Sequence, residues 1–473
     1  MKFDQKFFKS AIPEATFIGV DVPSQWSISI DSRELNKGDI FIALKGAQYD
    51  GHQFILQAIE KGAAGLIINK EQEKCLKTIS STILDKIFIA LVKDTKACLF
   101  DLAYHWRTLF ASHVIGITGS IGKTSTKEIL SNILTLNKTK FIASIGNQNT
   151  EIGVCLSILK VRPEHEVAII EMGINKRGEM ARMANIIRPT NAIITAIGHS
   201  HMEGLGSIVD IANEKKDIFK YFKESNIGII NGDQTLLSNI SYNHPIVKFG
   251  CKTTNQVQAR KIQSNNIHTH FMLKLYKDRY KIVLDTNHPG RVTNTLAASS
   301  AAYLLNVPSN IIVAGIQMPL AIHSRFEQTS LKAKKGVLID DCYNASPESM
   351  KAALLAFEKV ESMGQKIAVL GDMLELGVNS SFWHRQLGRF LRKVPSLNHL
   401  ILVGNYVQWT KNTVPVGLTF EYVKDWQEAL AVLQIRLEKE AVILIKGSKN
   451  IQLINLVNEL KEHTKPYLAS ANA

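Results

Sequence analysis

The fold of this chain is decided by the stretch from residue 114 to residue 127, which has the sequence VIGITGSIGKTSTK. A short apolar run typical of a buried strand leads into Gly119 and Gly122, and a helical pattern follows with apolar residues at Ile129, Leu130, Ile133 and Leu134. A strand, a glycine turn and a helix start suit a phosphate, because backbone N–H groups and the positive end of the helix converge there. Lys123 can reach the outer phosphates, and the Thr124 hydroxyl can bind Mg²⁺. The stretch therefore predicts binding of ATP or GTP with Mg²⁺.

The bulk composition is that of a globular enzyme with several domains. A chain of 473 residues is too long for one hydrophobic core. Its 45% hydrophobic and 21% charged residues are ordinary for a folded protein. The formal net charge of +14 indicates either a basic surface or an anionic partner. No dense block of Lys and Arg with interleaved aromatic residues is present, which argues against nucleic acid as that partner.

The cysteines and the apolar segments favour a cytoplasmic protein. The five cysteines are far apart and form no C-x-x-C pair, which is typical of reduced thiols. Residues 1–6 lack the apolar core of a signal peptide, and no apolar stretch is long enough to cross a bilayer. We therefore expect a cytoplasmic location and no membrane span.

Three blocks of alternating strands and helices follow one another along the chain. Residues 1–112 have strand patterns at 39–44, 65–68 and 87–92. Residues 113–318 open with the phosphate loop, have strand patterns at 167–170 and 192–197, and have a hairpin pattern at 267–286. Residues 319–473 begin within a linker at 318–324 and have strand patterns at 336–341, 367–370, 400–403 and 442–445. We predict an α/β protein of three domains, with a mixed, mostly parallel central sheet and a Rossmann-like, doubly wound C-terminal domain.

Polar residues follow two of the predicted central strands. Glu171 comes directly after the strand at 167–170, and His201 comes shortly after the strand at 192–197. Because ligands bind beyond the carboxyl ends of parallel strands, we expect both side chains to lie near the phosphate loop. Glu171 is a candidate Mg²⁺ ligand, since Mg²⁺ prefers oxygen donors, although a helix-capping role stays open.

Together, these motifs resemble the Mur ligases, the ATP-dependent amide-forming enzymes of peptidoglycan precursor synthesis. The loop TGSIGKT at 118–124 is similar to the phosphate loop of that family, and residues 31–52 are similar to its UDP-sugar-binding domain. The stretch HSHMEGLGS at 199–207 resembles its histidine loop. The stretch DDCYNASPESM at 340–350 resembles the branch of the family that adds D-alanyl-D-alanine to a UDP-muramoyl tripeptide. Stretches at 146–153, 371–377 and 446–448 agree with that branch.

The resemblance implies roles for individual residues. Nucleotide contacts are implied for Thr118, Gly119, Ser120, Ile121, Gly122, Lys123, Thr124, Ser125, Asn294 and Arg325. Catalytic roles are implied for Lys123, His201, Lys215, Arg325 and Asp341. Ligands of two Mg²⁺ ions would be Thr124, Glu171, His201 and Lys215, the last as a carbamylated lysine. Substrate contacts are implied for Ser32, Arg33, Lys45, Asn149, Asn344 and Ser346.

The implied reaction is ATP-dependent addition of D-alanyl-D-alanine to UDP-N-acetylmuramoyl-tripeptide through an acyl phosphate, carried out by a cytoplasmic monomer without nucleic acid. Two alternatives stay open. One is another ligase of the superfamily, which would add an amino acid to a muramoyl peptide or glutamate to folate. The other is a non-catalytic nucleotide-binding module or a nucleic-acid-dependent NTPase. From the residues alone, Lys215 could be an exposed helix lysine and Tyr343 a core residue.

Overall fold

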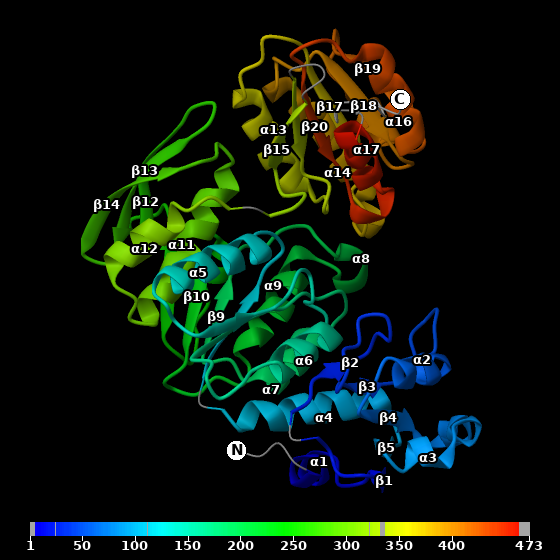
Figure 1. The fold of residues 1–473 in the computed structure, drawn as a ribbon. Helices are drawn as coiled ribbons and strands as arrows, with labels where there is room; N and C mark the ends of the chain where they lie inside the picture. Colours follow the sequence, from blue (N-terminus) through cyan, green and yellow to red (C-terminus); the bar gives the residue numbers. More distant parts are fainter. Residues whose placement is uncertain (1–4, 24, 111, 321, 332–335, 463–473) are drawn as a thin grey trace, which may run out of the picture.

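A computed structural model describes residues 5–23, 25–110, 112–320, 322–331 and 336–462. The described residues form three sheets, each with its own helices, which follow one another from the bottom to the top of Figure 1. Residues 1–4 of the N-terminal stretch and Ala321 of the predicted linker lie outside the described residues. The predicted three-part α/β architecture is confirmed, while the domain boundaries after residues 112 and 318 stay predictions.

The first sheet has five strands within the described residues, in the order β1-β5-β4-β3-β2. They are β1 (Thr16–Gly19), β2 (Ile28–Ser29), β3 (Ile40–Ile42), β4 (Gly65–Asn69) and β5 (Phe88–Val92). All neighbours are parallel except β1 and β5. The helices are α1 (Gln5–Ala11), α2 (Ile55–Glu60), α3 (Ser81–Leu84) and α4 (Thr95–Thr108), with 3-10 turns at Gly51–Phe54 and Lys70–Thr78. The Trp106 Nε1 group of α4 donates to the Val161 carbonyl at 3.0 Å, which ties this part to the central one.

The central sheet has nine strands in the part of the chain that is described, in the order β14-β13-β12-β11-β10-β9-β6-β8-β7. They are β6 (His113–Thr118), β7 (Phe141–Ala143), β8 (Val167–Glu171), β9 (Asn191–Ile194), β10 (Ile227–Asn231), β11 (Ile246–Gly250), β12 (Val257–Ser264), β13 (Thr269–Leu275) and β14 (Asp278–Leu284). The pairs β12–β13 and β13–β14 are antiparallel, and the other neighbours are parallel. The expected mixed sheet and its hairpin are therefore confirmed.

Helices cover both faces of the central sheet because alternate strand residues point to opposite sides. Ile115 and Ile117 of β6 pack with α5 (Lys123–Leu136), α11 (Pro289–Leu304) and α12 (Ser309–Ile316). Val114 packs on the other face with α6 (Glu151–Leu159), α7 (Glu179–Ile187) and α9 (Ile208–Lys216). The short helices α8 (Met202–Leu205) and α10 (Thr235–Ser238) and a 3-10 turn at Asp217–Phe219 complete this part.

The third sheet has the order β15-β16-β20-β17-β18-β19 across the described ranges. Its strands are β15 (Glu327–Leu331), β16 (Gly336–Asp340), β17 (Lys366–Gly371), β18 (His399–Val403), β19 (Thr419–Val423) and β20 (Val442–Lys446). Only the β15–β16 pair is antiparallel among these neighbours. Its helices are α13 (Pro347–Lys359), α14 (Ser380–Phe390), α15 (Gln408–Lys411), α16 (Trp426–Arg436) and α17 (Leu453–Glu462), with 3-10 turns at Gly377–Asn379, Leu391–Lys393 and Lys449–Ile451.

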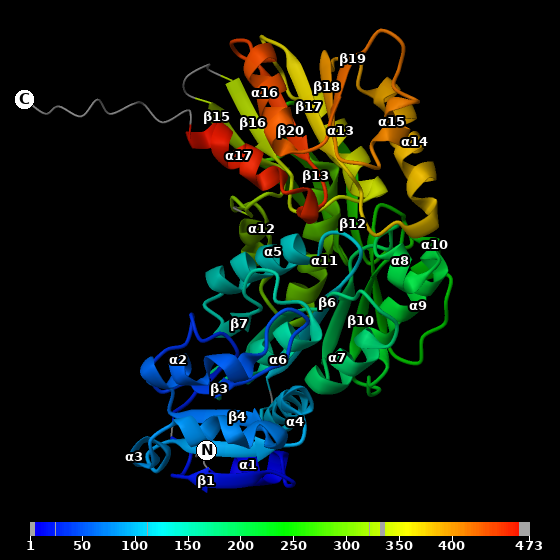
Figure 2. The same ribbon diagram turned by 90° about the vertical axis from the view of Figure 1, so that its right-hand side faces the viewer.

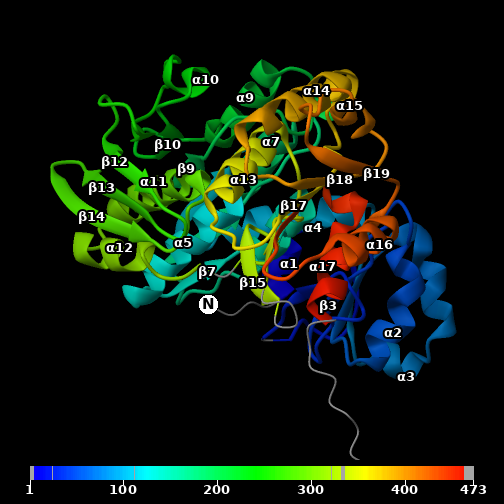
Figure 3. The ribbon, with the colours of Figure 1, turned by 90° about the horizontal axis from the view of Figure 1, so that it is seen from above.

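The third part is doubly wound, as predicted. One face of its sheet packs with α13 and α14, and the other packs with α16 and α17. Ser346 caps α13 through a capping box with Ser349, and Pro347 occupies the first turn. Figures 2 and 3 show this part lying over the central part of the chain. Among the described helices, none is long and apolar enough to cross a bilayer.

Candidate active site

The phosphate loop follows β6 in the middle of the central sheet. Gly119 and Gly122 have φ values of 150° and 89°, which residues with a side chain rarely adopt. A Cβ on Gly119 would lie 1.9 Å from Thr195 Oγ1, and one on Gly122 would lie 2.2 Å from Asn294 Oδ1. The Ser120 N–H donates to the Ala196 carbonyl at 2.7 Å, and the Thr195 hydroxyl donates to the Ile121 carbonyl at 2.6 Å. The loop is thus fixed against the segment after β9, with the N-terminus of α5 beside it.

Two oxygen atoms that could bind a metal ion, from Thr124 and Glu171, face each other next to this loop. The Thr124 hydroxyl donates to Glu171 Oε2 at 3.0 Å, and the Asn149 amide donates to Glu171 Oε1 at 2.9 Å. Two adjacent ligands of an octahedral Mg²⁺ ion lie ~2.9 Å apart, since each Mg–O bond is about 2.05 Å. The spacing of Thr124 and Glu171 therefore fits a shared Mg²⁺. Among the described residues, no cluster of three or more His, Cys, Asp or Glu could hold a metal. A site here accordingly needs the hydroxyl and substrate oxygens as well.

Lys123 is partly buried at the start of α5. Its ammonium group donates to the Gly119 carbonyl at 2.8 Å. Burial lowers the pKa of Lys123, the Glu171 carboxylate raises it, and the Arg325 guanidinium lowers it. Lys123 therefore lies near the charge of Glu171, in the central part, and that of Arg325, in the segment that leads into the third part.

Lys215 is only 1% exposed, so the interpretation of an exposed helix lysine is wrong. Burial and the nearby Lys123 charge hold the pKa of Lys215 well below its usual range, which favours the neutral amine. The neighbouring Glu214 carboxylate accepts the N–H groups of Gly178 and Met180 at 2.9 and 3.0 Å, and so caps α7. Among the described residues, Lys215 has no hydrogen-bonding partner for its side chain.

A cavity of 440 Å³ lies on one side of the phosphate loop. The site residues predicted from the sequence that line this cavity are Ser120, Ile121, Gly122, Lys123, Thr124, Ser125, Asn294, Arg325 and Asp341. Apolar residues also line it, among them Ile316, Met318, Leu320 and Phe326. Arg291 also lines it, and burial lowers the pKa of that guanidinium to about 10. A lining that combines the phosphate loop with apolar side chains suits a nucleotide.

A second cavity of 530 Å³ lies on the other side of the loop. Of the predicted residues, it is lined by Ser120, Ile121, Lys123, Asn149, Glu171, His201, Arg325, Asn344 and Ser346. His201 Nδ1 lies 2.5 Å from Glu375 Oε2, and the Ser200 hydroxyl is buried without a hydrogen-bond partner in the described part of the chain. Arg325 lies 4.0 Å above the Tyr343 ring. The two cavities therefore meet at Ser120, Lys123 and Arg325.

Three predicted substrate residues line neither cavity. The Ser32 hydroxyl donates to Gln57 Oε1 at 2.6 Å. Arg33 pairs with Asp31 at 2.7 Å and is 81% exposed. Lys45 forms a backbone bridge with Asp50. All three belong to the first-sheet part, so their role in binding stays a prediction. Lys215 and Thr118 also line neither cavity, although both are buried beside the loop.

The sequence did not assign roles to several residues that the structure brings here. Lys446, at the end of β20, pairs with Asp341 at 2.8 Å, with side-chain exposures of 2% and 10%. Tyr343 packs under Arg325 rather than in a core. Lys446 sits at the carboxyl end of a parallel strand, which is a signal that sequence reasoning can use. Glu348 and His199 carry no such signal, because they come together only through tertiary packing.

The fold and this pair of cavities define a nucleotide-binding α/β enzyme whose phosphate loop is shared by two adjoining sites. Comparison with known proteins agrees with that class. Residues 27–97 match the model of the Mur ligase family, catalytic domain, residues 117–302 match the Mur ligase middle domain, and residues 324–449 match the Mur ligase, glutamate ligase domain. The chain belongs to the Mur ligase family.

Relatives within the family match over nearly the whole chain. The UDP-N-acetylmuramoyl-tripeptide–D-alanyl-D-alanine ligase of Bacillus subtilis is 31% identical over 92% of this chain and 93% of its own length. The enzyme of that name from Escherichia coli is 30% identical over 92% of this chain and 94% of its own length. A crystal structure of MurF from Acinetobacter baumannii has a TM-score of 0.84 and 26% identity, and covers 98% of this chain and 99% of its own. The MurF ligase of Thermotoga maritima in complex with ADP has a TM-score of 0.77 and 27% identity, with 93% and 97% covered.

Proposed function

We propose that this chain is an ATP-dependent ligase that adds D-alanyl-D-alanine to UDP-N-acetylmuramoyl-tripeptide in peptidoglycan precursor synthesis. The meeting of the two cavities at Ser120, Lys123 and Arg325 carries this proposal, because a phosphoryl group on one side can reach a carboxylate on the other. Relatives of that name match more than nine-tenths of the chain. Another ligase of the superfamily, or a non-catalytic nucleotide-binding module, is not favoured.

The reaction follows from the need for a leaving group. A carboxylate oxygen of the tripeptide attacks the γ-phosphorus of ATP, and ADP departs. The amine nitrogen of the dipeptide then attacks the carbonyl carbon of the acyl phosphate, and the tetrahedral intermediate expels phosphate as the nitrogen loses its proton. The first step builds up negative charge on phosphoryl oxygens, and the second builds it up on the tetrahedral oxygen and the departing phosphate. Lys123 and Arg325, which line both cavities, are placed to neutralise that charge.

Magnesium fits the oxygen donors beside the loop. We assign Thr124 and Glu171 to one ion, and His201 with a carbamylated Lys215 to a second. Bound Mg²⁺ supplies charge neutralisation and orientation of the phosphates. The carbamate assignment is supported by the burial and lowered pKa of Lys215, since a neutral amine reacts with CO₂ and releases one proton. The carbamate would supply the oxygen atoms that a lysine lacks.

The remaining assignments divide the substrates among the three parts of the chain. The UDP-sugar would bind the part with Ser32, Arg33 and Lys45, within residues 1–112. ATP would bind residues 113–318, and the dipeptide would bind Asn344 and Ser346 within residues 319–473. Asn344 and Ser346 both line the larger cavity, which supports the assignment of the dipeptide to the third part. We also propose a monomer that works in the cytoplasm and has no nucleic-acid partner.

The test follows phosphate release and product mass. The chain is incubated with ATP, Mg²⁺ and UDP-muramoyl tripeptides that end in diaminopimelate or lysine, together with D-alanyl-D-alanine or with single amino acids. We expect phosphate and an amide product only with the dipeptide. Lys123→Ala should abolish both, whereas Lys359→Ala, an exposed lysine at the end of α13, should not. Product formation with a single amino acid, or polynucleotide-stimulated phosphate release without an amide, would refute the proposal.

A further inference from the structure

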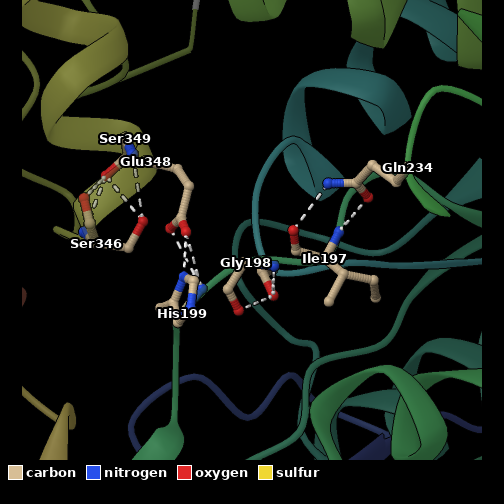
Figure 4. Close-up of polar contacts among 8 residues, drawn as sticks. Ile197, Gly198, His199, Gln234, Ser346, Glu348 and Ser349 are labelled. Carbon is tan, nitrogen blue, oxygen red and sulfur yellow. Dashed lines mark hydrogen bonds and ion pairs between the residues drawn. The ribbon is translucent and has the colours of Figure 1, made fainter. Parts of the chain in front are cut away.

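His199 joins the central part of the chain to the third part. It lies in the loop after β9, five residues beyond the end of that strand, whereas its partner Glu348 lies in the first turn of α13. His199 Nδ1 is 2.5 Å from Glu348 Oε1. The backbone N–H of His199 also lies 3.2 Å from both carboxylate oxygens (Figure 4). One carboxylate thus binds both the ring and the backbone of one residue across the boundary between two sheets.

A second element of the third part covers the same imidazole. The Trp383 ring of α14 lies 4.3 Å from the His199 ring, with 50° between the planes. Lys351 of α13 places its ammonium group 5.5 Å from the Trp383 ring. The His199 and Glu348 side chains are 21% and 36% exposed, so water partly screens their pairing. His199 is therefore enclosed between α13 and α14.

The loop that carries His199 is bonded directly to the phosphate loop. The Gly198 N–H donates to Ser120 Oγ at 3.0 Å, and Ser120 Oγ donates to the Gly198 carbonyl at 3.0 Å. The Gln234 side chain fixes the preceding residue, because it accepts the Ile197 N–H at 2.7 Å and donates to its carbonyl at 2.9 Å (Figure 4). A continuous series of bonds thus runs from Glu348 through His199 and Gly198 to Ser120.

The other end of this series is fixed as well. The capping box of Ser346 and Ser349 sets the start of α13, and hence the direction of Glu348. A Cβ on Gly198 would lie 3.0 Å from the Glu348 carboxyl carbon, so Glu348 sits directly on the loop. Ser346 lines the larger cavity and Glu348 the smaller. A shift of α13 relative to His199 would therefore alter both cavities at once.

We propose that His199 is a positioning residue. It contacts Glu348 and Trp383 of the third part of the chain and so holds that part over the phosphate loop. Through the bonds between Gly198 and Ser120, the same contact fixes the position of the phosphate loop. The role deepens the proposed ligase function and rests on it for its kinetic effect. Its structural effect does not depend on the reaction, because it concerns how α13 and α14 meet the central sheet.

The experiment combines scattering with kinetics on the full chain. Small-angle X-ray scattering with a non-hydrolysable ATP analogue and Mg²⁺ should give a larger radius of gyration for His199→Ala than for the unchanged chain. A charge-assisted hydrogen bond that is partly screened predicts about a tenfold rise in KM for the dipeptide. His199→Asn should restore most of the loss, since the Asn amide can donate to Glu348 from a similar position.

Two further variants separate a specific contact from general damage. Glu348→Gln alters the other partner of the contact. The double variant His199→Ala with Glu348→Gln should have a KM and a radius of gyration no larger than those of the more impaired single variant. His270→Ala removes an exposed histidine of β13 and should change neither readout. Unchanged compactness and KM in His199→Ala, or effects that multiply in the double variant, would overturn the proposal. Failure of the unchanged chain to form the amide would refute the ligase function alone, since the scattering comparison would still test His199.

Discussion

Replacement of Lys446 by methionine should destabilise the third part of the chain by about 3–5 kcal/mol, the cost of leaving one member of a buried ion pair alone. The Lys446 ammonium lies 2.8 Å from Asp341 Oδ2 and donates to the carbonyls of Asn344 and Asp341 at 2.9 and 3.3 Å. Methionine fills a similar volume but donates to none of these oxygens. Asp341→Asn should cost less, about 1–2 kcal/mol, because Lys446 keeps its two carbonyl acceptors.

Urea unfolding checks these values through tryptophan fluorescence. Trp383, Trp409 and Trp426 all belong to the third part, so they report its transition. The double variant Lys446→Met with Asp341→Asn should lose less stability than the sum of the two single losses, since it leaves no unpaired carboxylate. A loss below about 1 kcal/mol for Lys446→Met, against the range expected for a buried pair, would refute the reasoning. Simple addition of the two single losses would refute it too.

Three other outcomes are expected. Chelation of Mg²⁺ should stop phosphate release until Mg²⁺ is returned, and Thr124→Ala should raise the Mg²⁺ concentration for half-maximal rate; an unchanged requirement would exclude Thr124 as a ligand. Gly119→Ala should abolish nucleotide binding measured by calorimetry and cost about 1–3 kcal/mol of stability, because its Cβ would lie 1.9 Å from Thr195 Oγ1. Burial lowers the pKa of His384, so the unfolded chain binds the proton more readily and stability should fall by up to about 1.4 kcal/mol per pH unit below pH ~6.5. Urea titrations across pH should show that slope, and His384→Gln should reduce it, while His165, His244 and His288, whose pKa values burial also lowers, keep part of it.

The sequence predicted most of the strands at the centres of the sheets. Runs such as Ile367–Leu370 are apolar throughout because both faces of a parallel strand are buried, and this pattern is visible without any structure. The strand predicted at 192–197 is shorter, since β9 ends at Ile194. The Thr195 N–H still donates to the Thr118 carbonyl at the end of β6, but its hydroxyl bonds to the phosphate loop. Apolar character alone could not reveal that change of role.

The edges of the sheets were harder to predict. β2 has only two residues, and β19 exposes much of its length, so neither gives a continuous apolar run. β12 lies inside the central sheet, but a register shift between Arg260 and Gln263 interrupts its alternation as well. Edge strands are defined by the neighbour they pair with, and that neighbour can lie far away in the sequence.

The residues of the candidate site also fall into those that the sequence could place and those that it could not. Residues at the carboxyl ends of central strands, such as Glu171, could be placed near the phosphate loop from topology alone. The burial of Lys215 had a local signal too, because it lies three and four positions after Ala212 and Ile211, both buried on the inner face of α9.

The contact between His199 and Glu348 had no comparable signal, since 149 residues separate the two side chains. Local patterns show which face of a helix or strand is buried, but not which part of the chain covers it. An acidic residue in the first turn of α13 is explained equally well by the helix dipole, so the sequence gives no reason to expect a second role for Glu348. Its second role required knowing that α13 lies over the loop after β9. Residues that position one domain on another are therefore the ones that sequence reasoning is least able to find, and they are also where substitution can change activity without touching a substrate.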